Sequence, residues 1–178
     1  IAENNSGKSS PLSRDFLQSR IKLVADYSIE SKMDKYGDNV YARLSWDWGI
    51  GVYLYGLLHA YETSDENSHL LFIKNWLRYK IDKGIQVNHT DQVIPSAILL
   101  ELLNKHLIQD HEKYHIVIEQ TFHFLSKDST LTLKGCEQDG IRKNAHFPWK
   151  TRGWLDDFFM STPFILMYDK LYDEKELR

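Results

Sequence analysis

Apolar residues recur at intervals of three and four along almost the whole chain, and this periodicity constrains the fold more than any other feature. Such spacing places side chains on one face of an α-helix, whereas alternation, which is typical of a half-buried strand, is almost absent. The pattern predicts helices over about residues 13–29, 47–61 and 66–81, a fourth after Pro95, a fifth around Tyr114 to Leu125, and a sixth from about residue 154. We therefore predict an all-α fold.

Several residues mark where these helices should begin and end. Ser13 and Asp47 stand where an N-cap is expected, and Gly84 stands where the third helix should stop. The segment 127–149 is polar, contains the short β-prone patch TLTL, and is interpreted as a long ordered loop. The predicted apolar stripes include Leu17, Ile21 and Val24 in the first helix; Leu54, Leu57, Leu58 and Tyr61 in the second; Leu70, Ile73, Leu77 and Ile81 in the third; and Phe159, Phe164 and Leu166 in the sixth.

A weak internal repeat suggests how the helices are arranged. The stretch LLHAYETSDENSHLLFIKNWL reads as helix end, acidic turn and helix start, and LLNKHLIQDHEKYHIVIEQTF repeats this scheme about 45 residues later. LMYDKLYDEKEL begins it again. Because a lone α-hairpin cannot bury both of its faces, neighbouring hairpins must stack. The expected architecture is an array of antiparallel helix pairs, either an open solenoid or part of a closed α/α toroid.

Composition narrows the classes of partner. The net charge is -3 and the sequence pI is about 6.2, without a basic block, which argues against nucleic acid. The single cysteine, Cys136, excludes an intrachain disulfide, and charges interrupt every apolar run before membrane-spanning length. Since the chain starts at Ile1, we interpret it as a processed or truncated product, with residues 1–12 a flexible leader before a domain over 13–178. The compartment, cytoplasmic or periplasmic or secreted, is left open.

Polar and aromatic residues gather just before alternate helices. The stretch SWDWG precedes the second helix, NHTDQVIP the fourth and FPWKTRGWLDD the sixth. Alternate helices of a hairpin array run parallel, so these three loops should meet at one end of the structure. A cup lined by carboxylates, histidines and indoles is expected there.

One stretch resembles a known family. WLDDFFMSTPF, preceded by His146 and Pro148, looks like the W-x-D-x-x-x-M signature of the unsaturated rhamnogalacturonyl hydrolases of glycoside hydrolase family 105, which are related to the unsaturated glucuronyl hydrolases of family 88. The segment from Trp46 to Leu77 is similar to the first inner hairpin of these enzymes. The resemblance implies part of an (α/α)6 toroid, with this chain supplying about the N-terminal half.

The resemblance also implies a reaction, the hydration of a sugar with a C4–C5 double bond. Protonation of C4 and addition of water at C5 give a hemiketal whose opening breaks the glycosidic link. The family pattern assigns the proton donor to Asp156 and the second carboxylate to Asp91, and no metal or organic cofactor is required. Apolar neighbours would raise the pKa of Asp156 and a helix N-terminus would lower it, so the balance stays open. The simpler alternative is that Asp156 and Asp157 cap a helix, and that Asp91 belongs to a turn.

Further side chains are candidates for holding a sugar. His89 and His146 could bind the uronate carboxylate, and indole rings could stack on sugar faces, namely those of Trp46, Trp48 and Trp154. The alternatives are solvated loop histidines and tryptophans in the core, where Met160 and Phe164 are also expected. A different class of function is a non-catalytic helical module that binds carbohydrate or a protein. In either case uncovered apolar faces would favour a homodimer or a missing C-terminal half.

Overall fold

The computed structural model describes residues 13–128 and 155–172, and every regular element in these ranges is helical. The elements in chain order are α1 (Arg14–Tyr36), η1 (Gly37–Asn39), α2 (Val40–Arg43), α3 (Trp48–Ser64), α4 (Asn67–Asp82), η2 (Thr90–Gln92), α5 (Val93–Asn104), α6 (Glu112–His123), η3 (Phe124–Asp128) and α7 (Leu155–Tyr172). The prediction of an all-α fold is confirmed. None of the helices in these ranges has the length and apolarity needed to cross a membrane. The proposed leader and most of the predicted loop, including TLTL, lie outside the described residues.

Local signals fixed several helix ends as predicted. The Ser13 hydroxyl accepts the backbone N–H of Phe16 at 3.2 Å, and the Asp47 carboxylate accepts the backbone N–H of Ile50 at 3.1 Å. Both predicted N-caps are therefore confirmed. Gly84, at φ +81°, follows α4 in the left-handed region that glycine tolerates best. At α6 the cap is His111, whose Nδ1 accepts an N–H at 3.1 Å.

Helices α3 and α5 run side by side in the same direction. Near their starts Gly51 lies against Ile94, and at their ends Lys105 forms an ion pair with Glu62. The sequence predicted that α3 and α5 run parallel, because one antiparallel helix, α4, lies between them in the chain. Their N-terminal ends therefore open on the same end of the molecule.

Helix α7 continues this parallel set. The Thr121 hydroxyl at the end of α6 donates to Ser96 at the start of α5, at 2.8 Å, so α5 and α6 are antiparallel. The Tyr168 hydroxyl near the end of α7 donates to Glu119 at 3.3 Å, within α6, and the Tyr172 hydroxyl lies 3.2 Å from the ring of His115, nearer the start of α6. Helices α6 and α7 are thus also antiparallel, so α7 runs in the direction of α5.

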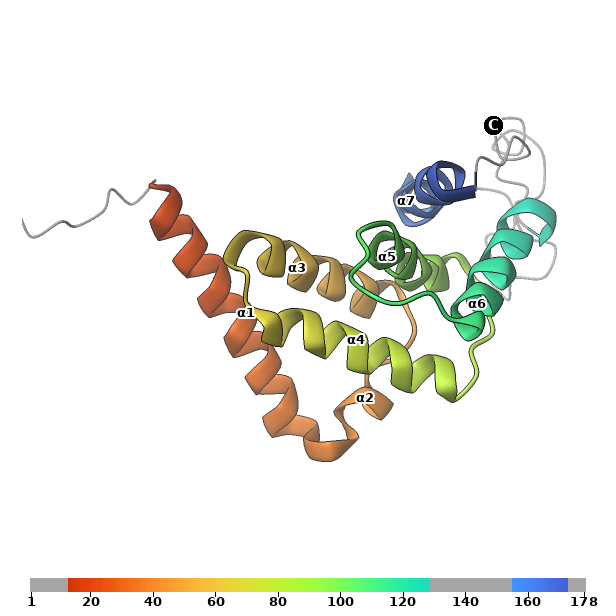
Figure 1. The fold of residues 1–178 in the computed structure, drawn as a ribbon. Helices are drawn as coiled ribbons and strands as arrows, with labels where there is room; N and C mark the ends of the chain where they lie inside the picture. Colours follow the sequence, from red (N-terminus) through yellow and green to blue (C-terminus); the bar gives the residue numbers. More distant parts are fainter. Residues whose placement is uncertain (1–12, 129–154, 173–178) are drawn as a thin grey trace, which may run out of the picture.

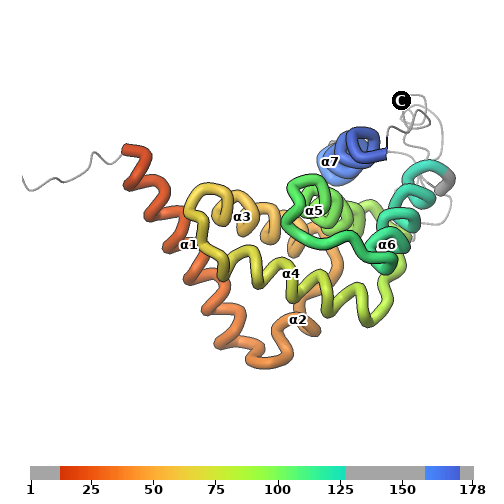
Figure 2. The backbone as a smooth tube through the Cα atoms, viewed as in Figure 1, coloured from red at the N-terminus to blue at the C-terminus, as the bar shows by residue number. Residues whose placement is uncertain are grey.

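The helices form two layers with α1 at one edge. Helices α3, α5 and α7 lie next to one another, whereas α4 and α6 lie on one side of them (Figure 1). Helix α1 packs on α3 and α4 at one edge of the described residues (Figure 2). This arrangement is the one expected for part of an α/α toroid.

The core lies between the two layers. It includes the indole pair of Trp46 and Trp76, stacked at 5.0 Å between ring centroids. The predicted stripes of α3 and α4 are buried apart from the half-buried Tyr61, and Met160 and Phe164 are core residues as expected. The fully buried large side chains include Leu54, Leu58, Ile73, Leu77, Ile98, Leu99, Leu102 and Phe164.

The predicted stripe of α1 is wrong, and that of α7 is wrong except for the buried Phe164. Leu17, Ile21 and Val24 of α1 are 48%, 40% and 67% exposed, and Phe159 and Leu166 of α7 are 62% and 65% exposed. Helical spacing locates a face but not the neighbour that covers it. Helix α1 instead turns the opposite face, with Ala25 buried, toward α3 and α4.

Replacing Gly51 with alanine should destabilise the fold. A Cβ at this position would overlap the side chain of Ile94 and press on Pro95, because Gly51 of α3 lies directly against the first turn of α5. Overpacking of this kind costs about 1–3 kcal/mol of unfolding free energy. Urea unfolding measures it, with Gly56→Ala as the matched control, since nothing lies within 4 Å of a Cβ at Gly56. Equal stability of the two variants would contradict this packing.

The junction of α1 and α4 should make stability fall in acid. Asp26 accepts from Lys22 at 2.6 Å and from the buried His69 at 2.7 Å. The Lys22 ammonium, helped by His69, holds the pKa of Asp26 below its usual value. A lowered folded-state pKa stabilises the fold above the unfolded-state value of about 4, and this contribution is lost as pH falls through the folded pKa.

We expect the unfolding free energy of the wild type to fall from neutral pH to about pH 3 more steeply than that of Asp26→Asn. Asp15→Asn, also in α1, is the control and should keep the wild-type slope. An Asp26→Asn variant with the wild-type slope would show that this junction does not titrate with folding.

Candidate active site

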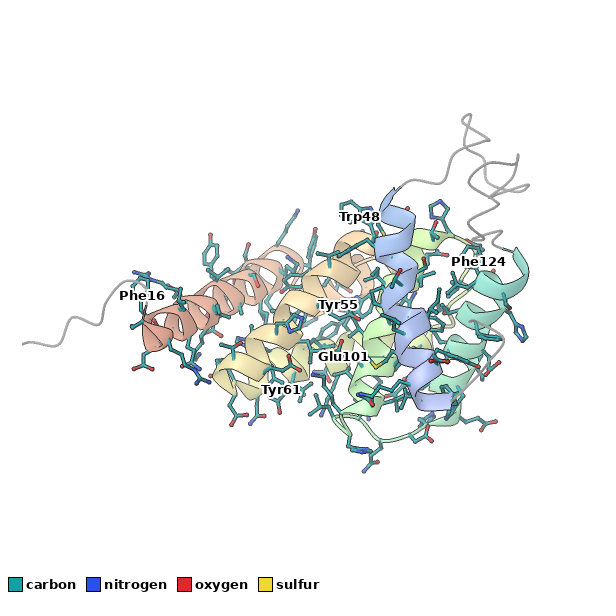
Figure 3. The ribbon with its side chains drawn as sticks, turned by 90° about the horizontal axis from the view of Figure 1, so that it is seen from above. Phe16, Trp48, Tyr55, Tyr61, Glu101 and Phe124 are labelled. Atoms are coloured by element: carbon teal, nitrogen blue, oxygen red, sulfur yellow. The ribbon has the colours of Figure 1, made fainter. Side chains whose placement is uncertain are left out.

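The three parallel helices bring their N-terminal ends together at what we call the rim: Trp48 at the start of α3, His89 and Asp91 before α5, and the first turn of α7 from Leu155. Helix α7 contacts η2, the short turn that holds Asp91. Seen from above, Trp48 and one end of α7 lie at the same end of the molecule (Figure 3). Two of the three predicted polar-aromatic loops, SWDWG and NHTDQVIP, thus meet. Of the third, FPWKTRGWLDD, only the last three residues belong to the described part of the structure.

Hydrogen bonds fix the connection that carries Asp91. The Trp46 indole N–H donates to the carbonyl of Gln92 at 2.9 Å, and the side-chain oxygen of Gln92 accepts the N–H of Asn88 at 2.9 Å. Within the turn, Nδ1 of His89 accepts the N–H of Asp91 at 3.2 Å. The turn is therefore anchored to the core through Trp46.

His89 and Asp91 form a contact pair at the rim. Nδ1 of His89 lies 3.1 Å from Oδ2 of Asp91, and the side chains are 26% and 39% exposed. Because Nδ1 accepts an amide proton, the neutral ring carries its own proton on Nε2.

The tryptophans divide between rim and core. Trp48 is 52% exposed, so much of it is accessible to solvent at the rim. Trp46 is only 8% exposed and stacks on Trp76, which supports the core-packing alternative rather than a sugar platform. Its effect on the rim is indirect, through the hydrogen bond to Gln92.

The remaining candidates are placed only in part. Asp156 and Asp157 lie in the first turn of α7, and the positions of their side chains are outside the described part of the structure. His146 and Trp154 fall in the undescribed segment 129–154. No cluster of metal-binding side chains occurs within residues 13–128 and 155–172, and His115 instead lies 2.7 Å from a carboxylate oxygen of Asp110.

A further polar group beyond the rim escaped the sequence analysis. The Tyr55 phenol of α3 bonds Glu101 of α5, and burial together with this carboxylate raises the pKa of Tyr55 (Figure 3). Lys105 lies 3.4 Å from Glu101 and also pairs with Glu62. These groups tie α3 to α5. The sequence signal for this group was Glu101, the one charged residue in the apolar helix α5, and it does not identify the partner.

The comparisons with known proteins agree with this architecture. The sequence model of Glycosyl Hydrolase Family 88 matches residues 20–178, so the protein is a member of a family of carbohydrate-cleaving enzymes. The chain belongs to Glycosyl Hydrolase Family 88. The unsaturated rhamnogalacturonyl hydrolase YesR of Bacillus subtilis (strain 168) is 20% identical over 132 residues, covering 74% of this chain and 37% of that relative. No solved structure matches the chain.

Proposed function

We propose that the protein to which this chain belongs is a glycoside hydrolase that acts on unsaturated uronyl oligosaccharides of the rhamnogalacturonyl type by hydrating their vinyl ether. The observation that carries the proposal is the contact of α7 with η2, which brings the first turn bearing Asp156 to the rim that holds Asp91. The family and the name of the similar Bacillus enzyme support the substrate class.

In the proposed reaction the Asp156 carboxyl gives its proton to C4 of the sugar. The double bond supplies the electron pair, and an oxocarbenium ion forms at C5. Water adds at C5 while a carboxylate, assigned to Asp91, accepts the proton that the water loses. Collapse of the hemiketal to a ketone at C5 then opens the sugar ring and leaves C1 as a hemiacetal. Collapse of that hemiacetal to an aldehyde breaks the bond to the rest of the oligosaccharide, which leaves with the proton of the hemiacetal hydroxyl. One proton leaves Asp156 and one reaches Asp91, so the enzyme as a whole is unchanged in charge.

The side chains around the two carboxylates have proposed roles in holding the sugar. Trp48 offers an exposed ring on which a sugar face can stack. His89, adjacent to Asp91, binds the uronate carboxylate or orients Asp91. His146 and Trp154 are assigned to the same site by their places in the family pattern. Trp46 contributes by supporting η2 from the core.

The test is incubation with lyase-treated pectin fragments, followed by the absorbance of the unsaturated uronate. We expect that absorbance to fall as the terminal sugar is released. Fragments of the same pectin made by acid hydrolysis have no double bond and are the matched control. Hydration predicts that they remain uncut, whereas cleavage of both sets would indicate direct displacement at the anomeric carbon. Binding of the fragments without turnover would favour a non-catalytic carbohydrate-binding module.

A further inference from the structure

One buried hydroxyl at the rim has no hydrogen-bond partner among the described residues. It belongs to Thr90, which is 1% exposed and is the buried residue of η2, between His89 and Asp91. The other two such side-chain atoms in the described ranges, Nδ1 of His69 and Oε1 of Gln120, belong to α4 and α6. A buried hydroxyl without a partner destabilises a fold. Its presence beside a proposed catalytic carboxylate points to a partner that forms during the reaction.

Hydrogen bonds fix the backbone on both sides of this hydroxyl. The N–H of Gln92 donates to the carbonyl of His89 at 3.0 Å, and the N–H of Asp91 donates to Nδ1 of His89 at 3.2 Å. The Trp46 indole holds the Gln92 carbonyl from the core. The Thr90 hydroxyl can therefore move only by rotation of its own β-branched side chain, which has few staggered positions. Its partner has to come from an element that packs on η2.

The helices around η2 narrow the choice of a side-chain acceptor. The turn packs chiefly on α3, α5 and α7. The start of α3 offers the Asp47 carboxylate, which already caps its own helix, and the start of α5 offers the Ser96 hydroxyl, which is already bonded to Thr121. The first turn of α7 carries two further carboxyl groups, Asp156 and Asp157. The acceptor is therefore sought in the turn that holds the proposed proton donor.

We propose that Thr90 is a positioning residue, whose hydroxyl donates to the carboxylate that Asp156 becomes as it protonates C4 of the sugar. This assignment rests on the proposed function. Before the reaction the Asp156 carboxyl holds its proton and is neutral. As the proton leaves, negative charge develops on its oxygens, and the hydroxyl pairs with them while keeping its own proton. A hydrogen bond that is made only in the transition state raises kcat, whereas one that is also made before it mainly strengthens binding.

The test compares two substitutions at residue 90 of the whole protein. Thr90→Val keeps the shape and removes the hydroxyl, so it should lower kcat on lyase-treated pectin fragments about tenfold to a hundredfold without changing KM. It should also raise the urea concentration at the midpoint of unfolding, because it removes an unpaired polar group from the interior. Thr90→Ser restores the hydroxyl, so it should recover most of the kcat that Thr90→Val loses. A merely structural role would move activity and stability in the same direction.

Thr121→Val is the matched control. The Thr121 hydroxyl is also buried, but it is hydrogen-bonded to Ser96 and to the carbonyl of Val117, both at 2.8 Å. Its removal leaves Ser96 without this partner, so the midpoint of unfolding should fall. The value of kcat should stay at that of the wild type. The two valine variants thus have opposite expected effects on stability and differ in their effect on turnover.

A second comparison identifies the carboxylate. Thr90→Val should lower kcat by the same factor in an Asp157→Asn background, since Asp156 is still present there. Loss of the effect in that background would assign the hydroxyl to Asp157 and overturn the proposal. So would a Thr90→Val variant that turns over at the wild-type rate, or one that unfolds at lower urea than the wild type, and both of these results would leave the proposed function standing. A wild type that does not cleave the fragments would overturn the two together.

Discussion

Asp156→Asn should abolish release of the unsaturated uronic acid while leaving the helical structure intact. Asparagine has nearly the same shape as aspartate but cannot give up a proton as an acid. General acid catalysis contributes about 10²–10⁴-fold to a rate, so the loss in kcat should fall in that range or exceed it. The measurement is the initial fall in absorbance on lyase-treated pectin fragments, with circular dichroism as the check on folding.

Asp157→Asn is the matched control, because it removes the neighbouring carboxylate from the same first turn of α7. If Asp157 only caps the helix or supports its neighbour, this variant should lose much less activity than Asp156→Asn. Two outcomes would contradict the assignment. One is turnover by Asp156→Asn at the wild-type rate, and the other is a greater loss in Asp157→Asn.

Trp76→Ala should have the largest effect on stability. The Trp76 indole is fully buried, stacks on Trp46, and donates its N–H to the carbonyl of Leu44 at 3.1 Å. Removing a buried ring of this size costs about 3–5 kcal/mol of unfolding free energy. Urea unfolding at neutral pH measures the loss. Because Trp46 in turn anchors Gln92, the variant should also loosen the turn that carries Asp91.

Trp48→Ala provides the comparison, since it removes the same side chain from an exposed position at the start of α3. Its unfolding free energy should stay within about 0.5 kcal/mol of the wild-type value. Its affinity for the oligosaccharide should fall if the ring stacks on a sugar. Equal destabilisation by the two substitutions would contradict the burial of Trp76 in the core.

Local chemistry in the sequence predicted much of the fold. The Ser13 and Asp47 caps act on backbone groups three residues away, so their effect is local and readable. The stripes of α3 and α4 were buried because each of these helices lies between neighbours. The predicted stripe of α1 is exposed, because no described element covers it, although its residues have the spacing of a buried helix face. Burial depends on the neighbour, and a single helix pattern does not contain that information.

The candidate site was predictable to a similar extent. The parallel direction of alternate helices was enough to bring the turn of Asp91 beside the start of α7. It could not separate Trp46 from Trp48, two residues apart, because their difference in exposure depends on a contact with Trp76 in another helix. The pairing of Tyr55 with Glu101 was missed for the same reason, since it joins two helices through side chains with no local signature.

The most direct test of the account is a crystal structure of Asp156→Asn with an unsaturated uronyl disaccharide bound. The account predicts the side chain of residue 156 within about 3 Å of C4 of the unsaturated ring, with Asp91 close enough to reach a water at C5. A sugar bound away from the rim, or a residue 156 side chain that bonds only backbone N–H groups of α7, would contradict it.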